Sequence, residues 1–123
     1  MAVTYTAAVK NARLTAVVTA IGATGVLEIG TAGMASVLAT IALNSTAGTA
    51  SGGVLTFSGF PKSDTSADNS GTAAAARIRT ASGGTDIVTG LTVGTSGSDI
   101  NLDSTSITAG QTVTINSATI THA

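Results

Sequence analysis

The sequence predicts a mainly β protein of the α+β class: an antiparallel β-sandwich or barrel-like domain preceded by one N-terminal amphipathic helix. Three observations predict this fold. Only one stretch, near the start of the chain, has apolar residues at helical spacing. From Gly25 onward, short runs rich in Val, Ile and Thr alternate with clusters of Gly, Ser and Asn, which is typical of strands joined by turns. At 123 residues, of which 43% are hydrophobic, the chain can form one compact core.

The helix is predicted over residues 5–21, because apolar side chains recur there at spacings of three and four residues. Thr4 or Thr6 can cap its N-terminus with a side-chain oxygen. Gly22 can end it, since Gly accepts the left-handed conformation that often follows a helix. The residues that define the apolar face are Leu14, Val17, Val18 and Ile21.

The rest of the chain is predicted to form seven strands. In the last of them, the side-chain alternation changes parity near residues 116–117, which predicts a β-bulge or a bend. Residues 44–53 are predicted to be a flexible connection and residues 60–71 an ordered loop. We divide the chain into a helical segment, residues 1–24, and a β-rich domain, residues 25–123. The predicted strands are residues 25–30, 37–43, 53–58, 72–79, 86–93, 99–102 and 112–121.

Composition limits the function classes. Charged residues make up only 9% of the chain, and five Lys and Arg cannot neutralise many phosphates, so no nucleic-acid partner is predicted. The absence of Cys excludes disulfides and thiolate catalysis. No apolar run reaches the roughly 20 residues that span a bilayer. The N-terminus lacks the pattern of a signal peptide. We therefore expect neither a membrane partner nor secretion.

Most apolar residues are small, since Trp is absent, Tyr occurs once and Phe occurs twice. At about 25 cal/mol per Å² of buried apolar area, a core of Ala and Val stabilises a fold less than one of Leu and Phe. The 15 Gly residues also raise the entropy that is lost on folding. We therefore expect stability to depend partly on neighbouring subunits, in a homo-oligomer or a larger lattice.

The sequence predicts no catalytic site. The single His, His122, is next to the last residue, and a catalytic triad needs a more rigid position than a chain end. Two carboxylate pairs, Asp64 with Asp68 and Asp99 with Asp103, are each four residues apart. In a strand or loop this spacing does not itself place the groups at the roughly 5–9 Å that a glycosidase needs. We expect a non-enzymatic protein without a cofactor.

One segment, residues 64–71 (DTSADNSG), allows a calcium interpretation, because it places oxygen ligands in a loop that ends with Gly. It departs from the EF-hand pattern, which requires a Gly and a Glu at fixed later positions. The other interpretation is turn chemistry, in which Asp and Asn side chains accept hydrogen bonds from nearby backbone N–H groups. We favour the turn and predict no metal site.

Four segments share motifs with one group of proteins. They open with YTAAVKNARL, continue with LTFSGF and DTSADNSGTA, and end with SGSDINL followed by GQTVTINSATIT. Together these motifs resemble small virion proteins of tailed bacteriophages, and the resemblance extends over most of the chain, from residue 5 to residue 121. The region between Ile29 and Val54 is shorter here than in fuller members of the group. The matching segments are residues 5–14, 55–60, 64–73 and 96–121.

The resemblance implies a capsid decoration (cement) protein. Such a protein is made in the host cytoplasm, binds the outer surface of the virion and bridges neighbouring units of the major capsid protein, often as a trimer. Lys10 and Arg13 lie three apart on the predicted helix and share a face, which is either solvated or a contact with an acidic patch of a partner. The candidate partner contacts are Lys10, Arg13, Arg77 and Arg79.

Two other functions compete with this expectation. A phage tail or head fibre, or another receptor-binding adhesin, would be expected to carry aromatic platforms for sugars, and only Tyr5, Phe57 and Phe60 are available. A small hydrolase or lysis factor is disfavoured by the missing catalytic residues. The position of the protein on purified particles would separate the three functions.

Overall fold

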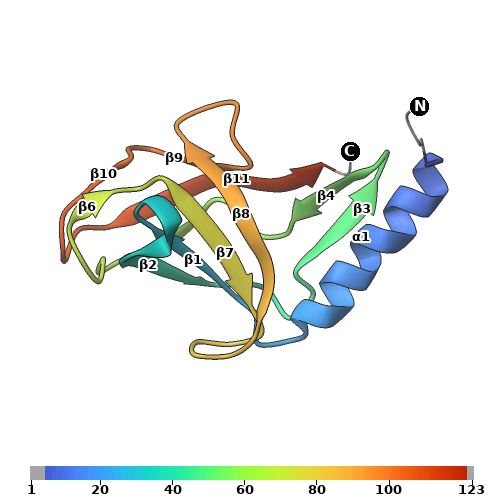
Figure 1. Cartoon of the computed structure of the whole chain (residues 1–123), viewed down its shortest axis with the longest axis horizontal. Coiled ribbons are helices and arrows are strands. Elements are labelled where there is room, and N and C mark those ends of the chain that lie inside the picture. Colours follow the sequence, from blue (N-terminus) through green and yellow to red (C-terminus); the bar gives the residue numbers. More distant parts are fainter. Residues whose placement is uncertain (1–4, 122–123) are drawn as a thin grey trace.

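The computed structural model describes residues 5–121 as one N-terminal helix, a strongly curled sheet of nine strands and a small sheet of two strands (Figure 1). The mainly β fold with a preceding helix is confirmed. The helices are α1 (Ala7–Ile21) and the short 3-10 helix η1 (Ala32–Met34). The strands are β1 (Val26–Gly30), β2 (Val37–Ala42), β3 (Gly48–Ser51), β4 (Val54–Phe57), β5 (Lys62–Asp64), β6 (Gly71–Thr72), β7 (Ala75–Arg79), β8 (Asp86–Gly94), β9 (Ile100–Leu102), β10 (Ser106–Ile107) and β11 (Val113–Thr121).

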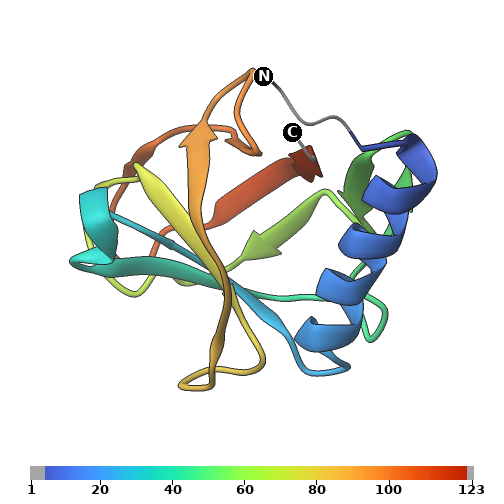
Figure 2. The same cartoon turned by 45° about the vertical axis from the view of Figure 1, so that its right-hand side comes forward.

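The large sheet has the order β2-β1-β7-β8-β9-β11-β4-β3, and β5 pairs with β11 beside this path. It curls into a half-barrel, which Figure 2 shows from a second direction. Strand β11 is central, because its first half pairs with β5 and β9 and its last residues pair with β4. All pairs are antiparallel except β8 with β9, which run parallel, so the sheet is mixed rather than purely antiparallel as predicted. Strands β6 and β10 form the small sheet.

The helix begins and ends with local caps. The Oγ1 of Thr6 accepts a hydrogen bond from the backbone N–H of Val9 at 3.3 Å, so Thr6 is the N-cap. Thr4, the other predicted cap, lies outside the described residues. At the other end, Gly22 has φ 75°, and its N–H donates to the carbonyl of Val18. Both signals are local, which explains why they are readable in the sequence.

Helix α1 packs on the hairpin of β3 and β4. Its inner face buries Leu14 and Ile21, with 3% and 1% of their surface exposed. The side-chain oxygen of Asn11 accepts a hydrogen bond from the backbone N–H of Gly53 in the hairpin turn at 2.9 Å. The helix is therefore held to the sheet by both apolar and polar contacts.

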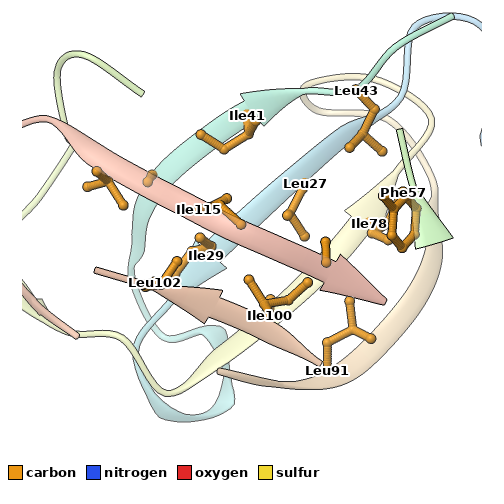
Figure 3. Close-up of a cluster of buried hydrophobic side chains, with 14 of the residues drawn as sticks. Leu27, Ile29, Ile41, Leu43, Phe57, Ile78, Leu91, Ile100, Leu102 and Ile115 are labelled. Carbon is orange, nitrogen blue, oxygen red and sulfur yellow. The ribbon is translucent and has the colours of Figure 1, made fainter. Parts of the chain in front are cut away.

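The core lies inside the curl of the sheet and contains mainly Ile and Leu (Figure 3). This differs from the predicted core of small Ala and Val side chains. Several Val residues are only partly buried at the margin of the core, whereas Ile and Leu residues occupy its centre. The largest fully buried side chains are Ile21, Leu27, Ile29, Leu38, Leu55, Ile78, Ile100, Leu102 and Ile115.

Strand β3 was not predicted, because residues 44–53 contain no Val, Ile or aromatic residue and are mostly Gly, Ala and Ser. The structure pairs β3 with β4 through a two-residue turn. The turn residues, Gly52 and Gly53, have φ values of 59° and 78°. A hairpin turn of this kind needs positive φ at both positions, and Gly adopts it without strain. The Gly-Gly pair is therefore the signal that could have identified this hairpin.

The predicted bulge in the last strand is confirmed. In the pairing of β11 with β9, the register shifts between Ile115 and Ser117, which leaves Asn116 as the extra residue. Buried Ile115 and buried Ala118 consequently face the same core although three positions separate them. The change of side-chain parity in the sequence reports this feature, because a bulge exchanges the faces of a strand.

Candidate partner-contact surface

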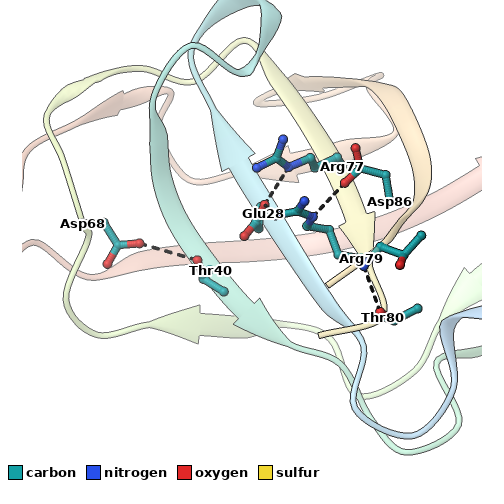
Figure 4. A network of polar contacts seen from close by, with 8 residues as sticks. Glu28, Thr40, Asp68, Arg77, Arg79, Thr80 and Asp86 are labelled. Carbon is teal, nitrogen blue, oxygen red and sulfur yellow. Dashed lines mark hydrogen bonds and ion pairs between the residues drawn. The ribbon is translucent and has the colours of Figure 1, made fainter. Parts of the chain in front are cut away.

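Two of the four predicted contact residues, Arg77 and Arg79, lie in an internal ion-pair cluster (Figure 4). On the neighbouring strand β1, Glu28 is 5% exposed and lies opposite Arg77. The Nε of Arg77 donates to Glu28 Oε1 at 2.6 Å, and a guanidinium nitrogen of Arg79 lies 3.9 Å from the same oxygen. Arg79 Nε lies 2.7 Å from Asp86 Oδ1 without forming a hydrogen bond. Both arginines therefore form ion pairs with neighbouring strands of the sheet.

The other two contact residues lie on helix α1 and differ from each other. Lys10 is half-buried, and its aliphatic stem covers Gly53 in the hairpin turn. Arg13 is exposed, and its guanidinium carbon lies 4.6 Å from the centre of the Tyr5 ring, a cation–π contact. Within residues 5–121 neither Lys10 nor Arg13 takes part in an ion pair. The helix therefore carries two positive charges that the described part of the chain does not neutralise.

The segment with the calcium interpretation covers the free edge of strand β2. The two carboxylate oxygens of Asp64 accept hydrogen bonds from the backbone N–H groups of Thr40 and Ser66, both at 3.0 Å. The backbone N–H of Asp68 donates to the carbonyl of Leu38 at 2.7 Å. Since Asp64 also lies on β5, which pairs with β11, this segment links β11 to β2 and fills the gap in the barrel. We refer to residues 64–69 as the edge cap.

Asn69 completes the edge cap, because its side-chain amide donates to the carbonyl of Val37 at 3.0 Å. The Thr40 hydroxyl donates to a carboxylate oxygen of Asp68 at 3.5 Å. Figure 4 marks this contact with a dashed line. Only the bond from Ser66 to Asp64 is the local turn contact that the sequence predicts, whereas the other bonds of these side chains reach strand β2. The sequence could not show that their targets lie on β2, more than twenty residues earlier in the chain.

The remaining candidates form no joint site. Asp99 accepts the backbone N–H of Thr92 at 3.0 Å, whereas Asp103 is exposed. His122 lies outside the described residues. Residues 5–121 contain no group of three side chains suited to a metal and no pocket. None of the helices in that part of the chain is long and apolar enough to cross a membrane.

The chain was compared with protein families, curated proteins and solved structures. No protein-family model, no curated protein and no solved structure matches the chain. The candidate function therefore depends on the residues themselves and on the motifs described above.

We expect the substitution Asp64→Ala to lower the free energy of unfolding by about 1–2 kcal/mol, because it leaves the Thr40 N–H without its acceptor. Urea unfolding measures this change. The matched control is Asp103→Ala, which removes an exposed carboxylate and should change stability by less than about 0.5 kcal/mol. Equal stability of both variants would show that the edge cap does not hold β2.

Proposed function

We propose that this protein is a non-enzymatic capsid decoration protein of a tailed bacteriophage. It binds the outer surface of the virion as a homo-oligomer and stabilises the shell by bridging units of the major capsid protein. The motifs of residues 5–14, 55–60, 64–73 and 96–121 support the virion class. In the structure these segments contain the start of the helix, most of strand β4, the edge cap and strands β9 to β11.

The distribution of ion pairs among the basic residues supports helix α1 as the contact surface. Of the five basic residues, Arg77 and Arg79 are paired with carboxylates and Lys62 donates to the side chain of Asn44 at 2.7 Å. Lys10 and Arg13 are left without a carboxylate in the described part of the chain. Unneutralised charge on a rigid helix favours an acidic partner, and complementary charge mainly increases the rate of association.

The proposal is tested by co-sedimentation of the purified protein with empty capsid shells. We expect the wild-type protein to bind assembled shells far better than free capsid subunits, because a site that spans two subunits exists only in the lattice. The double variant Lys10→Glu/Arg13→Glu should bind more weakly, and the difference should shrink at high salt because salt screens exposed charges. Circular dichroism checks that the helix is retained.

The outcomes separate the parts of the proposal. If the wild-type protein does not bind shells, the decoration function is wrong. If wild type and double variant bind equally at low salt, the basic residues of the helix are not part of the contact. Labelled protein that is found on the tail or on fibres would support the adhesin instead.

A further inference from the structure

We infer that the outer face of helix α1 docks into an apolar groove of its partner that is bordered by carboxylates. The surface consists of Tyr5, Val9, Ala12, Arg13 and Ala16, and we call it the helix docking face. The identity of the partner, a protein of the capsid shell, rests on the proposed function. The chemistry of the partner is inferred from the residues of the face.

The first observation is the position of exposed apolar groups. Within the described residues, the large hydrophobic side chains left exposed are Tyr5 and Val9, at 41% and 43%. Tyr5 lies just before the helix, and the Arg13 guanidinium over its ring places it on the same side as Val9, which is four residues from Arg13. Exposed Ala12 and Ala16 continue the same side of the helix and carry no polar group. A row of this kind fits a groove, as in other complexes where a helix presents residues one turn apart.

The second observation is the charge beside this row. Arg13 follows Val9 by four residues, and its guanidinium lies over the Tyr5 ring. The helix contains no Asp or Glu that could neutralise it. Tyr and Arg are enriched among the residues that dominate binding energy at interfaces. A partner carboxylate next to the groove would pair with Arg13 while the groove covers Tyr5 and Val9.

The charge also argues against a second copy of the chain as the occupant. Arg13 lies next to the middle of the helix, which extends from Ala7 to Ile21. Two copies of α1 that pack about a two-fold axis, or side by side in parallel, would place Arg13 near its own counterpart. Like charges across an interface are unfavourable. An acidic surface of a different protein has no such conflict.

The helix is also ready to bind without rearrangement. The Thr6 cap, the bond from Gly53 to Asn11 and the buried Leu14 fix its ends and its middle to the sheet. A partner therefore does not bear the entropy cost of ordering this segment. Since the inner face is held by these contacts, the outer face is the side that remains exposed.

The test compares three variants in the co-sedimentation assay with empty shells: Val9→Asp, Tyr5→Ser and the control Thr15→Asp. Val9→Asp places a charge in the docking face. Thr15→Asp adds the same charge to an exposed position about 120° further round the helix. We expect at least about tenfold weaker binding for Val9→Asp and Tyr5→Ser, as for other central interface residues. Thr15→Asp should bind within about twofold of the wild-type protein, the range in which rim positions usually fall.

Melting temperatures of all three variants show whether the fold is retained. Tyr5 precedes the helix, so Tyr5→Ser leaves the helix residues unchanged. Weaker binding by Val9→Asp and Tyr5→Ser, but not by Thr15→Asp, supports the docking face. Equal binding by all variants and the wild-type protein overturns the docking face and leaves the decoration function in place. Absence of wild-type binding overturns the decoration function and the docking face together.

Discussion

We expect the substitution Glu28→Gln to lower the free energy of unfolding by about 2–3 kcal/mol. Removing one partner of a buried ion pair costs about 3–5 kcal/mol, because the other charge is left without compensation. Here the arginine side chains are 22% exposed, so solvent screens the unpaired charge. We therefore expect the smaller loss of about 2–3 kcal/mol. Glutamine keeps the size of the side chain and can still accept a hydrogen bond from Arg77. The measured loss therefore reports mainly the charge.

The matched control is Asp86→Asn, which removes the other carboxylate of the same cluster. The Asp86 side chain is 42% exposed, and exposed ion pairs usually contribute about 0–1 kcal/mol. Urea unfolding of both variants at neutral pH compares the two losses. A larger loss for Asp86→Asn than for Glu28→Gln would show that Arg79, rather than Arg77, holds the cluster together.

We expect a loss of about 2–5 kcal/mol for Ile115→Ala, the usual range for truncating a large aliphatic side chain in a core. Ile115 is fully buried on the central strand β11, opposite Leu102 of β9 and Lys62 of β5. Three strands meet at this position, so the surrounding structure cannot easily collapse into the space that the side chain leaves. Thermal or urea unfolding measures the change.

The control for this substitution is the next residue, Asn116→Ala. Asn116 is exposed in the bulge, so its truncation should change stability by less than about 1 kcal/mol. If Ile115→Ala and Asn116→Ala lower the free energy of unfolding by the same amount, then β11 is not packed in the register described here. A loss below about 1 kcal/mol for Ile115→Ala alone would have the same meaning.

The helix and most strands could be predicted because their signals are local. Apolar spacing located the helix, and a change of side-chain parity located the bulge near Asn116. Strand β3 has small residues, so its composition does not distinguish it from the flexible connection that is predicted there. Strand β5 fell within the predicted loop, since its three residues form a strand only through pairing with β11. The parallel pair of β8 and β9 likewise depends on the assembled barrel.

Among the candidate contact residues, some features also depend on long-range pairing that the sequence does not show. All four basic residues were equal in the sequence, yet only the register between β1 and β7 decides that Arg77 meets Glu28, which is 49 positions away. Once that pairing is known, Lys10 and Arg13 stand out as unneutralised. The exposed position of Val9 agrees with helical spacing, because Val9 lies outside the apolar face that contains Leu14 and Ile21.

The edge cap also affects what happens when many molecules are crowded together. Strand β2, with the sequence VLATIA, has no charge and no Pro, a composition that favours strand-to-strand association between molecules. The cap occupies the N–H of Thr40 and the carbonyls of Leu38 and Val37, which are the groups that a foreign strand would need. A chain without the cap would expose a template for fibril growth. Residues 64–69 therefore close this edge of the sheet to strand pairing between molecules.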